Sequence, residues 1–286
     1  KGERQPMKLT IRLERPEDYR EVEALTREAF WGVFHPTCDE HYLVHKLRNS
    51  RDFVPALDMV AESDGRIVGR ILYTKARVTD AAGRENEVLT FGPLSVLPAY
   101  WKRGIGTALM RATIDRAREL GYRGIVIFGH PDYYCRVGFR PAGEFGIVTG
   151  QGDAYDAFMA LPLYPGALDG IAGVYRESPD FEMDEAAAKA FDNTFPPKAP
   201  ADMAPIDTLL KRLAPPARRA IETLKLPALN WLSRFSGREI RALEGMDDAA
   251  MEQINAARRE QGMPEKEEGR SPLDFTTRIK NEKYTK

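Results

Sequence analysis

The chain has 286 residues, of which 43% are hydrophobic and 30% are charged. These proportions are typical of a folded globular protein and exclude an intrinsically disordered chain, and the length suffices for one sizeable domain plus a smaller one. The 42 Lys and Arg residues nearly balance the 43 Asp and Glu residues, so net charge does not draw the protein to nucleic acid or to an anionic membrane.

Cysteine usage and hydropathy predict the compartment. The two cysteines, Cys38 and Cys135, cannot build a disulfide framework. The sequence lacks both a run of about 18 apolar residues and a signal-peptide core at its start. We therefore expect a cytoplasmic protein that does not enter a membrane, and we interpret residues 1–6, which precede Met7, as a leader or a cloning remnant.

Hydrophobic periodicity predicts alternating strands and helices through the first 163 residues. A strand is expected at 8–13, followed by a helix that Pro16 opens and that runs to about Trp31. The dipeptide Asp64-Gly65 predicts a tight hairpin between two strands. The remaining expected elements are a helix at 40–49, strands at 57–62, 66–78 and 87–97, a helix from Ile105 that Gly121 ends, a strand at 124–128, a short helix at 131–137, and strands at 139–148 and 157–161.

Composition changes after about Leu163. The stretch 165–205 is rich in Gly, Pro, Asp and Glu, which predicts an extended connector. Further on, the pattern is helical. Helices are expected at 217–224, directly after a capping box at Ser236-Gly237-Arg238-Glu239, and from Asp247 to Gly262. A mobile tail is expected at 269–286. The expected domains are therefore 7–163, a connector at 164–205, a small helical module at 206–263 and a flexible tail at 264–286.

A glycine-bearing turn lies between an apolar strand and a long amphipathic predicted helix, in the segment Arg103-Gly104-Ile105-Gly106-Thr107-Ala108. The first N–H groups of a helix have no partner within it, and the helix dipole adds positive charge there. Glycines keep side chains clear, so a pyrophosphate can contact those groups directly. The dinucleotide fingerprint fails because Leu109 holds its third glycine position, and no G-K-[ST] phosphate loop is present. The turn predicts that the chain binds a phosphate-rich cofactor. The alternative is that the two glycines mark only a turn.

This turn resembles the cofactor loop of the GNAT N-acetyltransferase superfamily. The family pattern Gln/Arg-x-x-Gly-x-Gly/Ala is met by Gly104 and Gly106, with Trp101 at its first position. The segment Gly92 to Pro98 is similar to the family's fourth strand, and Tyr133 to Phe139 is similar to its F-Y-x-x-x-G-F signature. The resemblance implies an α/β (α+β) GNAT fold, a mixed twisted sheet with helices on both faces, followed here by a small all-α module. It also implies acetyl-CoA as cosubstrate, no metal, and direct attack by an amine in a ternary complex.

The resemblance implies which residues hold the cosubstrate, because the family's fourth strand pairs with the pantetheine arm and its loop binds the pyrophosphate. The implied cofactor-binding residues are Leu94, Ser95, Val96, Trp101, Lys102, Arg103, Gly104, Ile105, Gly106, Thr107, Ala108 and Tyr134. The N–H of Val96 would stabilise the oxyanion, and Tyr134 would return a proton to the thiolate. The alternative for Tyr134 is an aromatic that fills the strand–helix junction, which is the preferred interpretation of Tyr133. Strand register decides whether Ser95 faces the site.

The group that deprotonates the incoming ammonium is less clearly marked. His41 and His45 lie one helical turn apart, next to Asp39 and Glu40. The family's first two helices line the acceptor side, so Glu40 and His41 are candidates for binding the amine or taking its proton, with a solvated helix start capped by Asp39 as the alternative. The Cys-x2-His-x3-His pattern has no fourth ligand, which argues against a metal. His130 is a third candidate base, unless it only hydrogen-bonds its own turn.

The C-terminal helices resemble the helical module in the C-terminal domain of the RNA polymerase α chain, which contains a helix-hairpin-helix. The hairpin would be Gly245-Met246-Asp247. The family's second hairpin glycine is missing and Asp247 would repel a phosphate, which argues against nucleic-acid binding and favours a packing role, a homodimer or a protein partner. Two functions follow: an N-acetyltransferase for a small-molecule or protein amine, or a non-catalytic acyl-CoA sensor whose helical module binds a protein or nucleic-acid partner.

Overall fold

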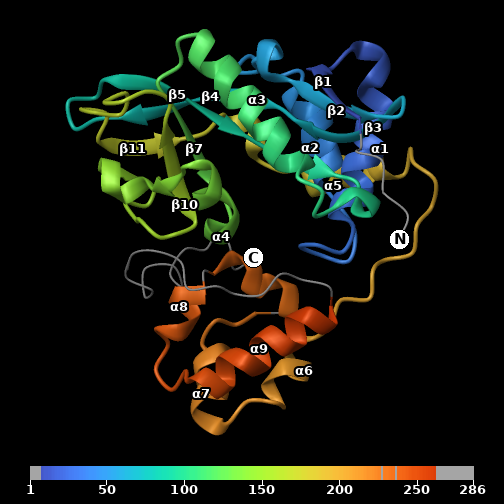
Figure 1. Cartoon of the computed structure of the whole chain (residues 1–286), viewed down its shortest axis with the longest axis vertical. Helices are drawn as coiled ribbons and strands as arrows, with labels where there is room; N and C mark the ends of the chain where they lie inside the picture. The colour runs from blue at the N-terminus through green and yellow to red at the C-terminus, as the bar shows by residue number, and fades with distance from the viewer. Residues whose placement is uncertain (1–7, 227, 236, 262–286) are drawn as a thin grey trace.

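The computed structural model describes residues 8–226, 228–235 and 237–261, which Figure 1 shows in colour. The expectations for residues 1–6, for Ser236 in the capping box, for Gly262 and for the tail at 264–286 lie outside these described residues. Among the described residues, no helix is both long enough and apolar enough to span a bilayer.

The helices and strands follow one another along the chain as follows. They are β1 (Leu9–Leu13), α1 (Tyr19–Phe30), α2 (Glu40–Leu47), β2 (Met59–Ser63), β3 (Arg66–Ile71), β4 (Tyr73–Thr79), β5 (Glu85–Phe91), β6 (Ser95–Val96), α3 (Ile105–Glu119), β7 (Gly124–Phe128), α4 (Pro131–Tyr134), β8 (Arg140–Pro141), β9 (Ile147–Val148), β10 (Phe158–Pro162), β11 (Gly173–Arg176), α5 (Glu185–Asp192), α6 (Ile206–Leu210), α7 (Pro215–Glu222), α8 (Gly237–Arg241) and α9 (Asp248–Glu260).

In the described part of the chain the strands form a four-stranded sheet, β1-β2-β3-β6, and a seven-stranded sheet, β8-β10-β7-β5-β4-β11-β9. Pairing is parallel between β5 and β7 and between β9 and β11, and antiparallel elsewhere, so the predicted mixed sheet is confirmed. Helices cover both faces of the four-stranded sheet. Gly69 in β3 faces Ile105 and Leu109 of α3, whereas the Ser95 hydroxyl in β6 hydrogen-bonds with Thr26 of α1.

Three predicted strands are interrupted. The strand expected at 66–78 divides at Leu72 into β3 and β4, which belong to different sheets. Leu72 is fully buried, and a run buried on both faces gives no alternation that marks the break. The strand expected at 87–97 divides into β5 and β6 around Pro93, which has no N–H to offer a ladder. The strand expected at 139–148 is reduced to the two-residue strands β8 and β9 around a 3-10 turn.

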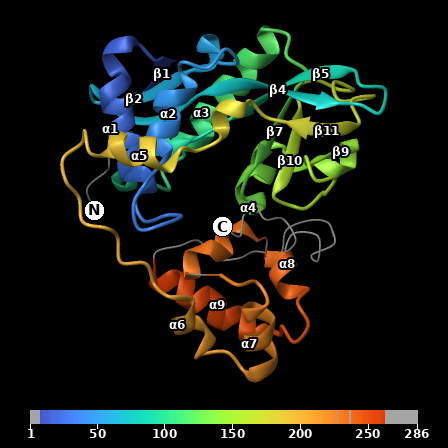
Figure 2. The same ribbon diagram turned by 180° about the vertical axis from the view of Figure 1, so that it is seen from behind.

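The stretch 165–205, expected to be an extended connector, contributes two packed elements instead. β11 pairs with β4 through Val174, Tyr175 and Arg176. Asp184 caps α5, since its side chain accepts a hydrogen bond from the N–H of Ala187 at 3.0 Å. Both views show α5 beside α1 and α2 (Figures 1 and 2). The Gly- and Pro-rich composition predicts the turns of this segment correctly, but it gives no indication of the short strand β11 and the short helix α5 between them.

Helices α6 to α9 enclose a buried apolar cluster of their own, which includes Leu209, Ile221, Leu232 and Ile254. The predicted cap of the last helix is confirmed, because the Asp247 side chain accepts a hydrogen bond from the N–H of Ala250 at 2.7 Å. These helices lie below the sheets in Figures 1 and 2, on the side where α4 points.

Candidate active site

The N-terminus of α3 has the geometry of an anion site. Gly104 caps the helix with φ +79°, and a Cβ built there would meet nothing within 4 Å, so the space beside it is open. The N–H of Ala108 bonds back to Gly104 O at 2.9 Å and is the first to find a partner within the helix. The N–H groups of Ile105, Gly106 and Thr107 therefore precede the ladder, and the first turn contains no acidic residue.

Gly106 allows a close contact with Tyr133. A Cβ at this position would lie 2.6 Å from the phenol oxygen of Tyr133, well inside normal contact distance. Burial raises the pKa of Tyr133, and a hydrogen bond with Thr107 opposes that rise. The Tyr133 side chain therefore covers the first turn of α3 and lines the cavity that begins there, although the sequence favoured a packing role for it.

Strand β6 presents an open edge to the same space. The N–H of Leu97 donates to Val68 O at 3.0 Å, which makes the adjacent Val96–Gly69 pair a non-hydrogen-bonded one in the antiparallel ladder. The N–H and C=O of Val96 consequently point away from β3. The Val96 carbonyl accepts a hydrogen bond from the indole N–H of Trp101 at 2.7 Å. Trp101, which stands where the family has Gln or Arg, thus contacts the strand edge, and its side chain is half exposed.

A cavity of about 910 Å³ connects the α3 turn with this strand edge. Most of the predicted cofactor-binding residues line it: Leu94, Val96, Trp101, Lys102, Gly104, Ile105, Gly106, Thr107 and Tyr134. Ser95, Arg103 and Ala108 do not. The Ser95 side chain is buried on the α1 side of the sheet, and the Arg103 guanidinium lies over the Tyr100 ring at 5.1 Å. Arg136 lines the cavity as well, a contact that the sequence analysis missed.

Tyr134 lies where β7 ends. A Cβ at Gly129 would lie 2.4 Å from the Tyr134 ring, so glycine is the residue that permits this close approach. The ring packs against Phe91 and Phe139, with centroid separations of 5.8 and 5.7 Å. Burial raises the pKa of the Tyr134 phenol above its ordinary value. The phenol therefore stays protonated through the neutral range, as a proton donor must.

The structure places the two candidates on α2 away from this cavity. His41 is fully buried beneath α5, where its Nε2 lies 3.1 Å from a carboxylate oxygen of Asp192 and its ring packs against Phe191 and Phe195. Burial lowers the pKa of His41 to about 4. The sequence analysis missed this cover because α5 lies in the segment interpreted as a connector. His41 is therefore part of the packing between α2 and α5.

Glu40 and His130 also lie outside the residues that line the cavity. The Glu40 carboxylate accepts hydrogen bonds from the Cys38 thiol at 3.3 Å and the Asp39 N–H at 3.2 Å, and burial raises its pKa. Asp39 occupies the N-cap position of α2 but pairs with His35 at 3.3 Å instead of capping the helix. His130 is the N-cap residue of α4. Among the described residues, no group of three or more His, Cys, Asp or Glu side chains is arranged to hold a metal.

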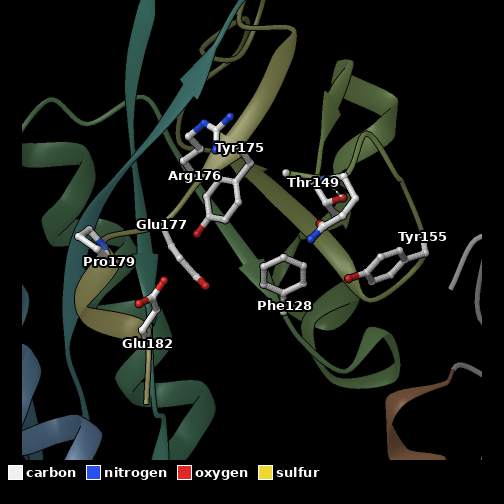
Figure 3. Close-up of a pocket in the computed structure, with 10 residues that line it drawn as sticks. Phe128, Thr149, Tyr155, Tyr175, Arg176, Glu177, Pro179 and Glu182 are labelled. Carbon is white, nitrogen blue, oxygen red and sulfur yellow. Dashed lines mark hydrogen bonds between the residues drawn. The ribbon is translucent and has the colours of Figure 1, made fainter. Parts of the chain in front are cut away.

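A second cavity, of about 410 Å³, lies near the end of β7 (Figure 3). Its residues come from β7, from the 149–155 turn, from β11 and from the segment that links β11 to α5. They are Phe128, Thr149, Gly150, Gln151, Tyr155, Tyr175, Arg176, Glu177, Pro179 and Glu182. The sequence analysis missed this cavity, and the signal available was the presence of two aromatic and three acidic residues between 175 and 182, inside the expected connector.

The N-terminus of α3 and the edge of β6 thus line one cavity beside the mixed sheet. The acetyltransferase (GNAT) family matches residues 20–137. Residues 20–137 therefore match the family that the sequence analysis predicted.

Relatives and solved structures agree with this assignment. The chain is 36% identical over 106 residues to an uncharacterized N-acetyltransferase, YjhQ, of Escherichia coli, a match that spans 58% of that relative. It is 29% identical over 167 residues to another, YhbS, of the same organism, covering 58% of this chain and 94% of the relative. The crystal structure of YhbS with CoA superposes with a TM-score of 0.55 at 26% identity, over 63% of this chain and 96% of that one.

Proposed function

We propose that the protein is an acetyl-CoA-dependent N-acetyltransferase that moves the acetyl group to a primary amine by direct attack in a ternary complex. The observation that carries this proposal is the cavity that joins the open N-terminus of α3 to the edge of β6 and to Tyr134. Its length suits a long cosubstrate: phosphate oxygens at the N–H groups of Ile105 to Thr107, the pantetheine arm along β6, and the thioester near Tyr134. The CoA complex of YhbS, a similar protein, supports the same assignment.

The reaction needs three events at the thioester. The neutral amine nitrogen bonds to the carbonyl carbon, and the N–H of Val96, which points away from β3, stabilises the resulting oxyanion. The C–S bond then breaks and its electrons stay with sulfur. Tyr134 supplies the proton that the thiolate takes up, and the proton lost by the amine balances this transfer. We assign Val96 and Tyr134 these roles, whereas Glu40, His41 and His130 receive none.

A titration of the purified chain with acetyl-CoA in a calorimeter tests the proposal. Gly104→Glu places an anion where we expect the pyrophosphate, so we expect micromolar binding in the natural chain and at least about a hundredfold weaker binding in this variant. Gly83→Glu is the matched control, because Gly83 has the same φ of +79° and the same open surroundings but lies in the turn between β4 and β5. Failure of the natural chain to bind acetyl-CoA would overturn the proposal.

A non-catalytic acyl-CoA sensor is the second candidate, and Trp101 is the observation that favours it. The Trp101 indole occupies a carbonyl on the strand edge that a pantetheine amide would otherwise use. Turnover separates the two functions, because an enzyme releases free thiol from acetyl-CoA when an amine is supplied. A chain that binds acetyl-CoA tightly, yet releases no thiol with any of a broad panel of primary amines, is a sensor.

We propose that the acetyltransferase domain continues past Leu163 through α5, since β11 and α5 pack into it. The helices from residue 206 onward would form a separate module with its own apolar cluster. A hairpin role for Gly245-Met246-Asp247 in binding a protein partner remains a prediction, and so does a homodimer.

A further inference from the structure

The 410 Å³ cavity lies near the end of β7, the neighbour of β5 in the seven-stranded sheet, on the face to which Phe128 and Tyr175 belong. Among the described residues these two strands pair only at Leu89 and Ile125. Because side chains alternate along a strand, Phe91 belongs to the core beneath α3, where Tyr134 also packs, and Phe128 to the core on the other face. Beyond the Leu89–Ile125 pair, the described residues of β5 and β7 are not bonded to each other. Phe128 at the end of β7 lines the 410 Å³ cavity, and Tyr134, which follows β7, lines the 910 Å³ cavity, so both cavities adjoin the end of β7.

Aromatic rings form much of the inner wall of this second cavity. Phe128 and Tyr175 approach with a centroid separation of 6.0 Å, and Tyr155 and Phe128 with 6.3 Å. Tyr175 is only 3% exposed, and its phenol oxygen makes no hydrogen bond of normal geometry with the described residues, although Thr90 lies nearby. Burial, reinforced by the neighbouring Glu177 carboxylate, raises the pKa of the Tyr175 phenol, so it remains a neutral donor.

Carboxylates complete the wall. Figure 3 shows the Glu177 and Glu182 carboxylates directed toward the space that the Tyr175 and Tyr155 hydroxyls also face. Arg176 lines the cavity too, but its guanidinium points away from both carboxylates in this view. A cavity with π faces on one side and carboxylates on the other attracts a cation with an apolar body and repels an anion.

We infer that this cavity binds the acetyl acceptor as a small ammonium ion with an alkyl or arylalkyl body, held by Glu177 and Glu182. The inference rests on the proposed function, since the amine would have to reach the thioester at the end of β7, which both cavities adjoin. A volume of about 410 Å³ lies within the usual range for small-ligand sites, which favours a free small molecule over a protein chain. Acidic amines are excluded by repulsion from the two carboxylates.

Direct binding tests the inference without requiring turnover. We would titrate the full chain, saturated with CoA, with 2-phenylethylammonium and with 2-phenylethanol, a neutral compound of the same shape. The natural chain should bind the ammonium at least about tenfold more tightly than the alcohol. Glu177→Gln should abolish this preference and Glu182→Gln, at an exposed position, should reduce it. Glu119→Gln, on the exposed surface of α3, is the control and should leave it unchanged.

The same titrations separate this inference from the proposed function. Equal affinities for ammonium and alcohol, no binding of either, or a preference that survives in both cavity variants would overturn the inference, even where acetyl-CoA binds normally. If the chain binds the ammonium and this binding depends on Glu177, the cation site is supported. If the same chain does not bind acetyl-CoA, the proposed acetyltransferase function is overturned. Melting temperatures of the variants, compared with that of the natural chain, identify any loss of binding caused by unfolding.

Discussion

Single contacts decide the chemistry of the cavity at the α3 turn, and the contact between Gly106 and Tyr133 is one that can be tested. A methyl group at residue 106 would meet the Tyr133 phenol oxygen at 2.6 Å, so Gly106→Ala must displace that side chain. We expect acetyl-CoA to bind about tenfold more weakly, the scale of a modest overpacking penalty. Tyr133→Phe removes the clashing atom, so the double variant should recover most of the affinity. Additive losses in the calorimeter would contradict this explanation.

In the proposed mechanism Tyr134 supplies the proton to the thiolate, so its removal should affect turnover alone. Tyr134→Phe keeps the ring that packs against Phe91 and Phe139 but removes the proton donor. We expect kcat to fall by roughly a hundredfold or more, with the affinity for acetyl-CoA and the melting temperature unchanged. Because burial raises the phenol's pKa, natural-chain kcat should show no loss from phenol ionisation below about pH 10. An unchanged kcat in the variant would remove Tyr134 from the mechanism.

Among the elements, α5 and α2 form a packing unit whose stability depends on pH. Burial beneath α5 lowers the pKa of His41 to about 4 from an ordinary value of 6.5. The folded state therefore holds this ring neutral, while the unfolded chain takes up a proton as pH falls below about 6.5. The stabilisation is complete above that pH and is lost progressively toward pH 4.

We expect the melting temperature to drop between pH 6.5 and pH 4, and His41→Phe to make that drop smaller. His45→Gln, one turn further along α2 and half exposed, is the control. Thermal unfolding followed by circular dichroism at several pH values measures the effect. An identical pH dependence in the natural chain and in His41→Phe would show that His41 titrates normally.

The elements also show which parts of the fold the sequence predicts. The helix α3 and strand β7 have long periodic or wholly apolar patterns, and their positions match the predictions within a residue or two. β11 and α5 are short and lie between prolines and glycines, so composition outweighed their patterns. The breaks at Leu72 and Pro93 arise because the chain passes from one sheet to the other, which local periodicity does not record.

The candidate site divides in the same way. The N–H groups that have no partner within the helix, at the turn of Gly104 and Gly106, depend on residues that are neighbours in the sequence, so the sequence motif could predict them. The ammonium site depends on Phe128, Tyr175 and Glu177, which meet only after folding. The burial of His41 was not predicted for the converse reason: its cover comes from a segment about 150 residues away in the chain, as the pairing with Asp192 shows.

At the scale of the whole molecule, the C-terminal segment closes one side of the 910 Å³ cavity. Ala204, Asn230 and Gln261 line it, and the segment is held by hydrogen bonds to the loop after α1. The Trp231 indole donates to Phe34 O at 2.8 Å, and the Asn230 side-chain amide donates to Val33 O. The cavity that would hold acetyl-CoA is thus completed by helices that lie beyond the matched family range.

Disrupting this contact should weaken cofactor binding without touching the α3 turn. The double variant Asn230→Ala, Trp231→Phe removes both hydrogen bonds to the loop, so we expect several-fold weaker acetyl-CoA binding and faster proteolysis between α5 and α6. Arg212→Ala, whose ion pair with Glu260 lies within the C-terminal helices, is the control. Unchanged affinity and unchanged proteolysis would show that these contacts do not hold the segment in place.

The placement of the tryptophans has a practical consequence. The chain contains three: Trp31 and Trp101 line the 910 Å³ cavity, and Trp231, in the C-terminal segment, donates a hydrogen bond to Phe34 on the loop after α1. Intrinsic fluorescence excited at the indole band therefore samples this one region rather than the whole protein. Variants that replace one tryptophan at a time with Phe would therefore separate two events by fluorescence, without any added label. Trp31 and Trp101 would report on binding in the cavity, and Trp231 would report on detachment of the C-terminal helices.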